Sequence, residues 1–355
     1  MSNTVKTLLL FCFLLALASC RQDAGGSGFT ITVSAGSPAS TKAAGDVRDE
    51  RTVHRLDLFA FNADGVLENS FHSNEENDSG TLTASVTVSS GRKDFYLVAN
   101  APAELAASVT SVSGLLEAVS LFSQNARNRF VMTASRTGVA VTGDKTLEAE
   151  LVRVASRIEL KSVTKAFNSP ALQSLPFRIE ALFLMNVPMQ AHYFAASETQ
   201  GDSAASSGWG YWCRNNGSAS PANPPSDAVR ATTRWAPGSP VSVTGSSNAT
   251  AGHFLYAYPN IAPEADRADG TDYVTKLVLQ AKLGEDTVYY TLGIPQTGRN
   301  KAYEINELTI KRRGTLIPGE YVSTDDVSFR VTVRDWDSGV IQSSYADGSN
   351  GHYSI

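Results

Sequence analysis

Apolar and polar residues alternate along much of this chain, and a period of two strongly constrains what it can fold into. In the segment 29–34, Phe29, Ile31 and Val33 alternate with polar residues, and residues 82–88 repeat the pattern. Near the C-terminus the apolar positions are Val327, Phe329, Val331 and Val333. Such alternation is typical of a β-strand that buries one face. The sequence therefore predicts a mainly β protein.

A longer alternation begins at Leu147. One face has Val152, Val154, Ile158 and Leu160, and the other has Arg153, Arg157, Glu159 and Lys161. We expect a single long strand over this segment, with charged residues on the face opposite the core.

Length and composition favour two domains. The chain has 355 residues, of which 42% are apolar, enough for two packed interiors. We expect tandem β-sandwiches at 43–146 and 147–326, followed by a C-terminal segment at 327–355. One or two short helices are expected as well. The clearest begins at Ser113, where the apolar spacings of three and four involve Leu115, Leu116, Val119 and Phe122.

Charge and cysteine content exclude several classes of function. Thirty Lys and Arg residues against 35 Asp and Glu give a net charge of −5, so no cationic field gathers phosphates and no nucleic-acid partner is expected. Of the three cysteines, Cys12 and Cys20 lie in the leader and only Cys213 in the body. An intrachain disulfide framework and a cysteine-rich metal site are therefore excluded.

The first 19 residues read as a secretory signal peptide. Lys6 precedes an apolar run from Leu8 to Leu17, which is too short to span a membrane, and small residues lead to Cys20. The segment 17–20 resembles a bacterial lipobox, in which Cys20 is acylated and tethers residues 20–42 to the outer-membrane lipid. The alternative is an ordinary signal peptide with an incidental cysteine.

No pattern of residues indicates catalysis, and we predict no enzyme activity, no cofactor and no metal. The five histidines stand apart from one another and from other metal ligands, at positions 54, 72, 192, 253 and 352. Two carboxylate pairs, Asp325 with Asp326 and Asp335 with Asp337, are the basis of a weak alternative, a glycan-cleaving enzyme. Solvated turns are the simpler interpretation of both pairs.

A Ser-, Gly-, Asn- and Pro-rich insertion at 197–247 contains Trp209, Trp212 and Trp235. Tryptophans on such a surface can stack on sugar rings, so a surface lipoprotein that binds carbohydrate is the main alternative function. Packing of the loop on its own domain explains the same residues without a ligand.

Several motifs occur together in a fixed order. After the lipobox come Thr41-Lys42-Ala43, the strand at 56–61, and the run Phe95-Tyr96-Leu97-Val98-Ala99-Asn100-Ala101. They are followed by 130–133, by 151–158, which reads Leu-Val-Arg-Val-Ala-Ser-Arg-Ile, and by 331–336, which ends in Trp336. In this order the chain resembles the fimbrillin family, the type V pilus subunits of Bacteroidales. The resemblance implies transthyretin-like, Greek-key sandwiches and a structural role.

The resemblance also implies a route of assembly. In fimbrillins a trypsin-like surface protease cuts a lipid-anchored precursor in the loop after the first strand. The matching basic position here is Lys42, with Arg48 and Arg51 as substitutes, and the loop is of the exposed, small-residue kind that proteases prefer. The released strand would carry Phe29, Ile31 and Val33, leaving a slot for a strand from another subunit.

The C-terminal segment is the expected donor, because it offers the same alternating apolar face as the released strand. The donor residues would be Val327, Phe329, Val331, Val333 and Trp336. Alternatively, this strand closes its own domain and only the tail after Trp336 is exchanged. The expected partners are copies of this chain or related pilus subunits and, for adhesion, host glycans or proteins. One subunit giving and receiving one strand builds a filament.

Overall fold

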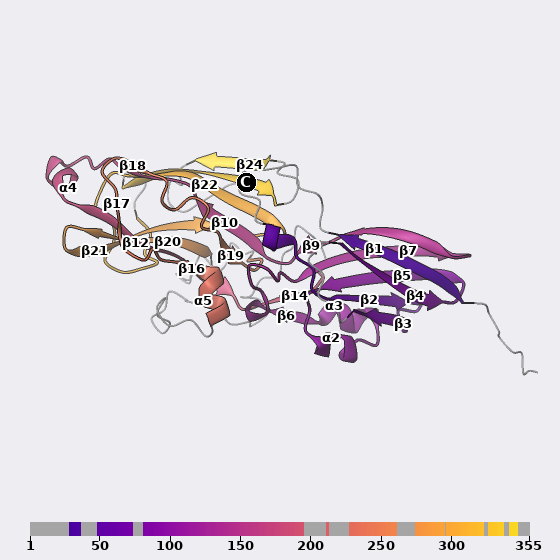
Figure 1. Cartoon of the computed structure of the whole chain (residues 1–355). Coiled ribbons are helices and arrows are strands. Elements are labelled where there is room, and N and C mark those ends of the chain that lie inside the picture. The colour runs from indigo at the N-terminus through magenta and orange to yellow at the C-terminus, as the bar shows by residue number, and fades with distance from the viewer. Residues whose placement is uncertain are drawn as a thin grey trace, which may run out of the picture.

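The protein is two β-sandwiches joined end to end, with the N-terminal one on the right of Figure 1. The computed structural model describes residues 28–36, 48–73, 81–194, 211–212, 227–260, 274–294, 296–322, 326–336 and 341–346. The predicted mainly β architecture with few short helices is confirmed. Among the described helices, none has the length and apolar character needed to cross a membrane.

The first sandwich has a five-stranded and a three-stranded sheet. The larger sheet has the order β3-β2-β5-β7-β9, formed by Leu67–His72, Leu56–Phe61, Gly91–Ala99, Met132–Val141 and Val152–Arg153. The smaller has the order β4-β1-β8, formed by Thr81–Val88, Phe29–Gly36 and Lys145–Glu150. Alternating apolar side chains of both sheets fill the space between them, as expected for strands with one buried face.

The short helices of this half lie below the larger sheet in Figure 1. They are α2 (Ala103–Ser108) and α3 (Val112–Glu117), and the 3-10 helix η1 (Arg48–Arg51) lies nearer the second sandwich. The helix predicted from Ser113 to Phe122 is too long: Val119 lies in β6 (Val119–Leu121) and Phe122 in the 3-10 helix η2 (Phe122–Gln124). Residues 119–121 pair with a strand of the second half instead of continuing the helix.

The second sandwich faces a seven-stranded sheet against a five-stranded one. The larger contains β10 (Ser156–Leu160), β11 (Val163–Lys165), β18 (Ser246–Ser247), β19 (Leu255–Ala257), β22 (Lys301–Ile310), β23 (Val327–Asp335) and β24 (Ile341–Ala346). The smaller contains β12 (Phe177–Met185), β16 (Arg234–Trp235), β17 (Val241–Ser242), β20 (Thr275–Leu283) and β21 (Asp286–Ile294).

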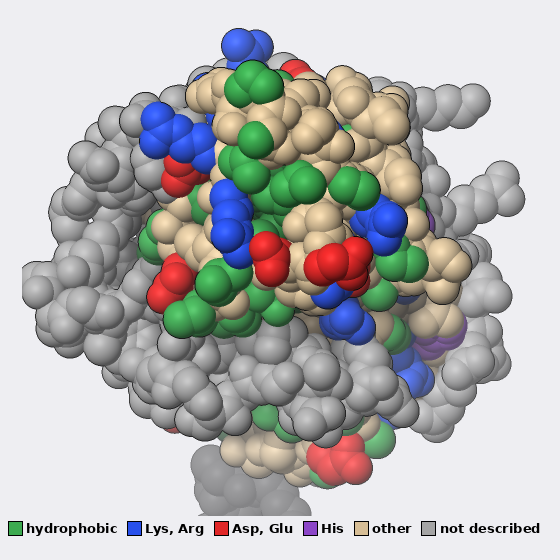
Figure 2. Space-filling view, turned by 90° about the vertical axis from the view of Figure 1, so that its left-hand side faces the viewer, with side chains coloured by type: hydrophobic (Ala, Val, Ile, Leu, Met, Phe, Trp, Pro, Cys, Tyr) green, Lys and Arg blue, Asp and Glu red, His purple; other side chains and the backbone are tan. Residues whose placement is uncertain are grey.

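The remaining elements are α4 (Pro170–Ser174), α5 (Asp227–Thr233), β13 (Val187–Pro188), β14 (Gln190–His192) and β15 (Tyr211–Trp212). The described part of the predicted 197–247 surface loop is therefore partly regular. Its strands β16 and β17 both pair with β12, so this part extends the sheet. Figure 2 views the outer end of the second sandwich, where hydrophobic side chains lie among charged ones.

The long strand predicted from Leu147 is broken into three. β8 pairs with β1 and β9 with β7, both in the first sandwich, whereas β10 pairs with β19 and β22 in the second. Strand pairing therefore changes from one sandwich to the other between Arg153 and Ser156, several residues after the predicted boundary at 146/147. The chain steps from sheet to sheet here, so its charged side chains do not share one solvent face.

The two halves are also joined by strand pairing and a buried hydroxyl. β6 of the first half pairs antiparallel with β14 of the second. Next to this pair, the Tyr258 hydroxyl contacts Ser120 Oγ and Asn125 Nδ2, each at 2.6 Å, and donates to the carbonyl of Leu121 at 3.1 Å. Burial raises the pKa of Tyr258, which keeps it protonated as a donor.

Candidate functional site

The first strand, β1, is the central strand of its sheet. It pairs antiparallel with β4 over its whole length and parallel with β8 from Ile31 to Gly36. In the described structure β1 is the only ladder partner of both strands in that sheet. Removing β1 would therefore leave β4 and β8 without pairing, on either side of a vacant slot.

Side chains of β1 fill the sandwich core in alternation. Ile31, Val33 and Ala35 have no exposed surface, whereas Phe29, predicted as one of three buried residues, is only half-buried. Phe29 is the first residue of the strand, opposite Val88, and packs against the core while remaining partly exposed. The three fully buried residues are therefore Ile31, Val33 and Ala35 instead of the predicted Phe29, Ile31 and Val33, a shift of two residues along the same face of the strand.

The predicted donor residues lie within their own domain. β23 pairs with β22 on one side and with β24 on the other. The four apolar residues of the strand are buried: Val327, Phe329, Val331 and Val333. By contrast, β24 follows Trp336 and pairs only with β23 among the described strands, so it forms an edge of the sheet, beside the C label in Figure 1.

The strands β1 and β23 have similar sequences. Residues 29–33 read Phe-Thr-Ile-Thr-Val, and residues 329–333 read Phe-Arg-Val-Thr-Val. The two segments match in three identical residues and in an Ile-to-Val exchange, so each presents almost the same apolar face to a core.

A buried carboxylate joins η1 to the residue that follows β23. Glu50, in η1, is 2% exposed. Its Oε2 accepts hydrogen bonds from Arg157 Nη1 and Trp336 Nε1, both at 2.9 Å, and its Oε1 from the Tyr256 hydroxyl at 2.5 Å. Arg153 Nε donates to the Glu50 carbonyl at 3.0 Å. We call Arg153, Arg157, Tyr256 and Trp336 together the Glu50 cage.

Aromatic contacts reinforce the Glu50 cage. The Arg153 guanidinium lies 4.7 Å from the Trp336 ring centroid, and the Trp336 and Tyr256 rings are stacked at 5.8 Å. Burial, and then the Glu50 carboxylate, raise the pKa of Tyr256, so its hydroxyl remains a donor. The sequence pattern places Arg153 and Arg157 on the face opposite the core, but both are buried. Arg157 pairs with the Glu50 carboxylate, and Arg153 donates to the Glu50 backbone carbonyl.

The predicted processing positions are only partly described. Cys20 and Lys42 lie outside the described residues. Arg48 and Arg51 begin and end η1, and Arg51 is half-buried. Immediately after η1, the Asn100 side chain donates to the Thr52 carbonyl at 2.9 Å and accepts from the His54 backbone N–H at 2.8 Å. Asn100 adopts φ 61°, a left-handed conformation that Asn tolerates better than most residues.

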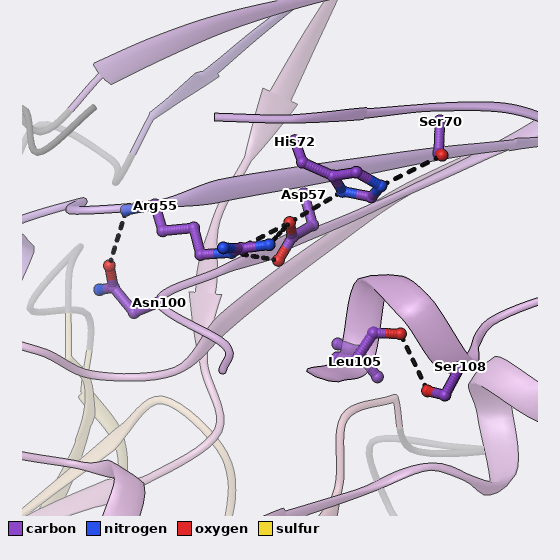
Figure 3. A network of polar contacts seen from close by, with 7 residues as sticks. All are labelled: Arg55, Asp57, Ser70, His72, Asn100, Leu105 and Ser108. Atoms are coloured by element: carbon purple, nitrogen blue, oxygen red, sulfur yellow. Dashed lines mark hydrogen bonds and ion pairs between the residues drawn. The ribbon is translucent and has the colours of Figure 1, made fainter. Parts of the chain in front are cut away.

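Figure 3 shows a network that sequence spacing did not reveal. Asp57, which is fully buried, accepts from Arg55 Nη2 at 2.9 Å and contacts His72 Nδ1 at 3.0 Å. His72 Nε2 lies 3.2 Å from Ser70 Oγ, the order of groups found in serine hydrolases. However, the Ser70 N–H, a potential oxyanion donor, already donates to Asn69 Oδ1 at 2.8 Å. The network ties β2 to β3, and we assign it a structural role.

The carboxylate pairs and tryptophans that the sequence singled out lie partly outside the described residues, and the described Asp335 and Trp235 contact other side chains. Asp325 and Asp337 lie outside the described residues, while the Asp335 carboxylate pairs with Lys301 Nζ at 2.5 Å. Across the described ranges, no group of three or more His, Cys, Asp or Glu is placed to hold a metal ion. Trp209 also lies outside, nothing is described of the Trp212 side chain, and Trp235 stacks on His253 at 4.3 Å.

A charged cluster links β23 to its neighbour β22, and from it we predict that the stability of the fold depends on pH in the acid range. Glu304 on β22 accepts from Lys161 Nζ at 2.8 Å and from Arg334 Nε of β23 at 2.9 Å. Burial acts to raise the pKa of Glu304, but these two cations outweigh it and lower the pKa below its ordinary value. The carboxylate therefore stabilises the fold above the unfolded-state pKa, and this contribution is lost as pH falls through the lower folded-state pKa.

We expect Glu304→Gln to reduce the loss of stability between neutral pH and about pH 3. Because water still reaches part of the cluster, the difference should be about 1 kcal/mol or less. Urea unfolding at the two pH values measures it. Glu307→Gln, an exposed position on the same strand, is the control. Equal acid sensitivity of wild type and Glu304→Gln would show that the cluster makes no such contribution.

The comparisons with known proteins agree with this architecture. Residues 29–161 match the family model described as major fimbrial subunit protein (FimA), which confirms the resemblance to the fimbrillins. That family consists of structural subunits of cell-surface fimbriae and not of enzymes. No protein of curated function matches the sequence.

Solved structures share the fold over nearly their whole length. A fimbrilin (FimA) from Porphyromonas gingivalis W83 is 16% identical, with a TM-score of 0.61, covering 87% of this chain and 98% of that one. A Parabacteroides distasonis ATCC 8503 protein described as a cell adhesion protein is 15% identical, with a TM-score of 0.62, covering 88% and 98%. At these identities the likeness establishes the fold alone.

Proposed function

We propose that the protein is a structural subunit of a cell-surface pilus that polymerises by donor-strand exchange and supports adhesion. It would be exported as a lipoprotein acylated at Cys20 and held at the outer membrane until a trypsin-like surface protease cuts the loop after β1. The observation that carries the proposal is the place of β1, whose loss would unpair β4 and β8 together. An incoming strand restores the pairing by β-augmentation.

Within this proposal the exchanged strand is β24 with the tail after it, and β23 stays in place. Detaching β23 would expose four buried apolar side chains, at about 1.5–3 kcal/mol each. Detaching β24 breaks a single ladder at the sheet edge. The partner is therefore another copy of this chain or a related pilus subunit, and each subunit gives one strand and receives one.

Two engineered disulfides that share one residue test this assignment. Arg330 is the register partner of Glu307 on β22 and of Ala346 on β24. In a Cys213→Ser background, Glu307→Cys with Arg330→Cys would staple β23 to β22, and Arg330→Cys with Ala346→Cys would staple β24 to β23. Directly opposite positions on adjacent antiparallel strands have the nearest Cβ atoms of the two strands, so they are the positions for such a staple.

After trypsin treatment we expect the β22–β23 staple to allow SDS-resistant ladders and the β23–β24 staple to block them until it is reduced. Blockage by both staples would show that β23 is part of the donor, and blockage by neither would show that the donor is not the C-terminal segment. No ladder from completely trimmed wild-type protein would overturn the polymerisation role. Ladders would be counted on gels, with reduced samples as the matched control.

A further inference from the structure

We infer that Glu50 anchors the N-terminal end of the processed subunit and confines the maturation cut to bonds before residue 48. The inference rests on the proposed function, because it concerns the same proteolytic step. It assigns a positioning role to a residue outside the strands that are exchanged. Figure 1 shows η1, the short indigo helix, between the two sandwiches, where the Glu50 cage holds it.

Several contacts at Glu50 would have to break before a protease could bind this segment. A protease binds several residues on each side of the bond in an extended form, so a folded segment must open before it is cut. Glu50 is two residues after Arg48 and one residue before Arg51, which places it inside the bound stretch for either cut. Both oxygens of its carboxylate and its backbone carbonyl are engaged.

The cost of that opening is set by buried charge. Withdrawing Glu50 would leave the Arg157 guanidinium, 7% exposed, without its carboxylate partner. It would also leave the Tyr256 hydroxyl and Trp336 Nε1 without their acceptor. Breaking a buried, hydrogen-bonded ion pair is strongly unfavourable, so the open state is rare.

The chain after Arg51 is held as well. Thr52 contributes its carbonyl to Asn100 Nδ2, and the next residue, Val53, is fully buried. The bond after Arg51 therefore has a fixed residue on each side. Of the three predicted cleavage positions, only Lys42 lies away from these contacts in sequence, eight residues before Glu50.

A consequence for assembly follows from the Trp336 contact. A cut before residue 48 leaves Glu50 on the processed subunit, where it continues to bind Trp336 at the end of β23. The anchor then separates the C-terminal chain into a fixed part, up to Trp336, and the segment after it. A cut after Arg51 would discard the anchor together with β1.

Limited trypsin digestion of the precursor, followed by mass measurement of the large fragment, tests the inference. The wild-type fragment should begin at Ala43, with the bonds after Arg48 and Arg51 resistant. In Glu50→Gln, which keeps the shape but removes the charge, cleavage after Arg48 or Arg51 should be at least about tenfold faster. Glu117→Gln, an exposed residue of α3, is the matched control and should behave as wild type.

Two milder variants keep the test decisive if Glu50→Gln unfolds. Tyr256→Phe and Trp336→Phe each remove one donor to Glu50 and keep an aromatic ring at the position, and each should accelerate the same cuts by a smaller factor. A wild-type fragment that begins at Asp49 or Thr52, or unchanged cleavage in all three variants, would overturn the inference. A fragment that begins at Ala43 but forms no ladder would leave the inference standing and contradict the proposed polymerisation instead.

Discussion

Replacing Ile31 by aspartate should destabilise the precursor by about 4 kcal/mol or more, while leaving the processed subunit unaffected. Ile31 has no exposed surface, so the substitution places a carboxylate in the sandwich core without a partner. The fold would then retain β1 poorly. In the proposed assembly the cut removes position 31 from the subunit, so polymers made from the variant should be as stable as those of wild type.

Thermal or urea unfolding of the precursor, and heating of the assembled ladders, measure the two effects separately. Thr32→Asp is the matched control, because Thr32 is on the opposite face of β1, where its hydroxyl contacts Ser85 Oγ at 3.0 Å. We expect it to cost about 1 kcal/mol or less. If the two substitutions weakened the precursor equally, β1 would not fill the core as described. If the Ile31 variant also weakened the ladders, the strand would not have been exchanged.

The second large effect is expected at the domain junction, where Trp336→Ala should cost about 3–5 kcal/mol of stability. The Trp336 ring is 5% exposed and contacts Phe130, Tyr256 and two guanidinium groups. Its removal leaves a cavity and also deprives Glu50 of one hydrogen-bond donor. Both losses act on the same free energy of unfolding.

Circular dichroism during urea unfolding measures this effect without depending on tryptophan fluorescence. Trp235→Ala is the control, since Trp235 is half-buried and stacks on one partner, His253. We expect it to change stability by about 1 kcal/mol or less. Trp336→Phe should fall between the two, because it keeps most of the packing and loses the N–H. Similar costs for Trp336→Ala and Trp235→Ala would show that the cage adds little.

Local pattern was enough to predict most strands. The alternations at Phe29, Leu82 and Val327 each correspond to a described strand, because one buried face imposes a period of two whatever lies opposite. The structure adds the neighbours of each strand, above all that β1 lies between β4 and β8.

Long-range electrostatics could not be predicted in the same way. The Glu50 cage joins residues up to 286 positions apart, and nothing near Glu50 in sequence distinguishes it from an exposed loop carboxylate. Arg153 and Arg157 alternate with apolar residues, which normally indicates a solvated face. One feature of the sequence does indicate buried charge: two arginines occur in a segment of otherwise apolar and small residues. A charged side chain buried in such a segment needs an oppositely charged or hydrogen-bonding partner.

The contact of Ser70, His72 and Asp57 shows a different limit of sequence-based prediction. Ser70 and His72 are two residues apart and so share a face of β3, but Asp57 joins them only through the register of β2 with β3. Geometry brings the three groups together. The residue types alone would suggest a catalytic triad. The hydrogen bonds around the three groups instead indicate a structural role, in which they link β2 to β3.

The way the two sandwiches are joined has a mechanical consequence. In the proposed pilus a pulling force would load each subunit along its length. The β6–β14 ladder, the Tyr258 hydroxyl and Glu50 all span the boundary between the two halves of the subunit. Contacts that act in parallel share a load, so the two halves of the subunit should respond to the force as one rigid body and should not separate from each other. The first element to yield under shear flow would then be the contact between subunits.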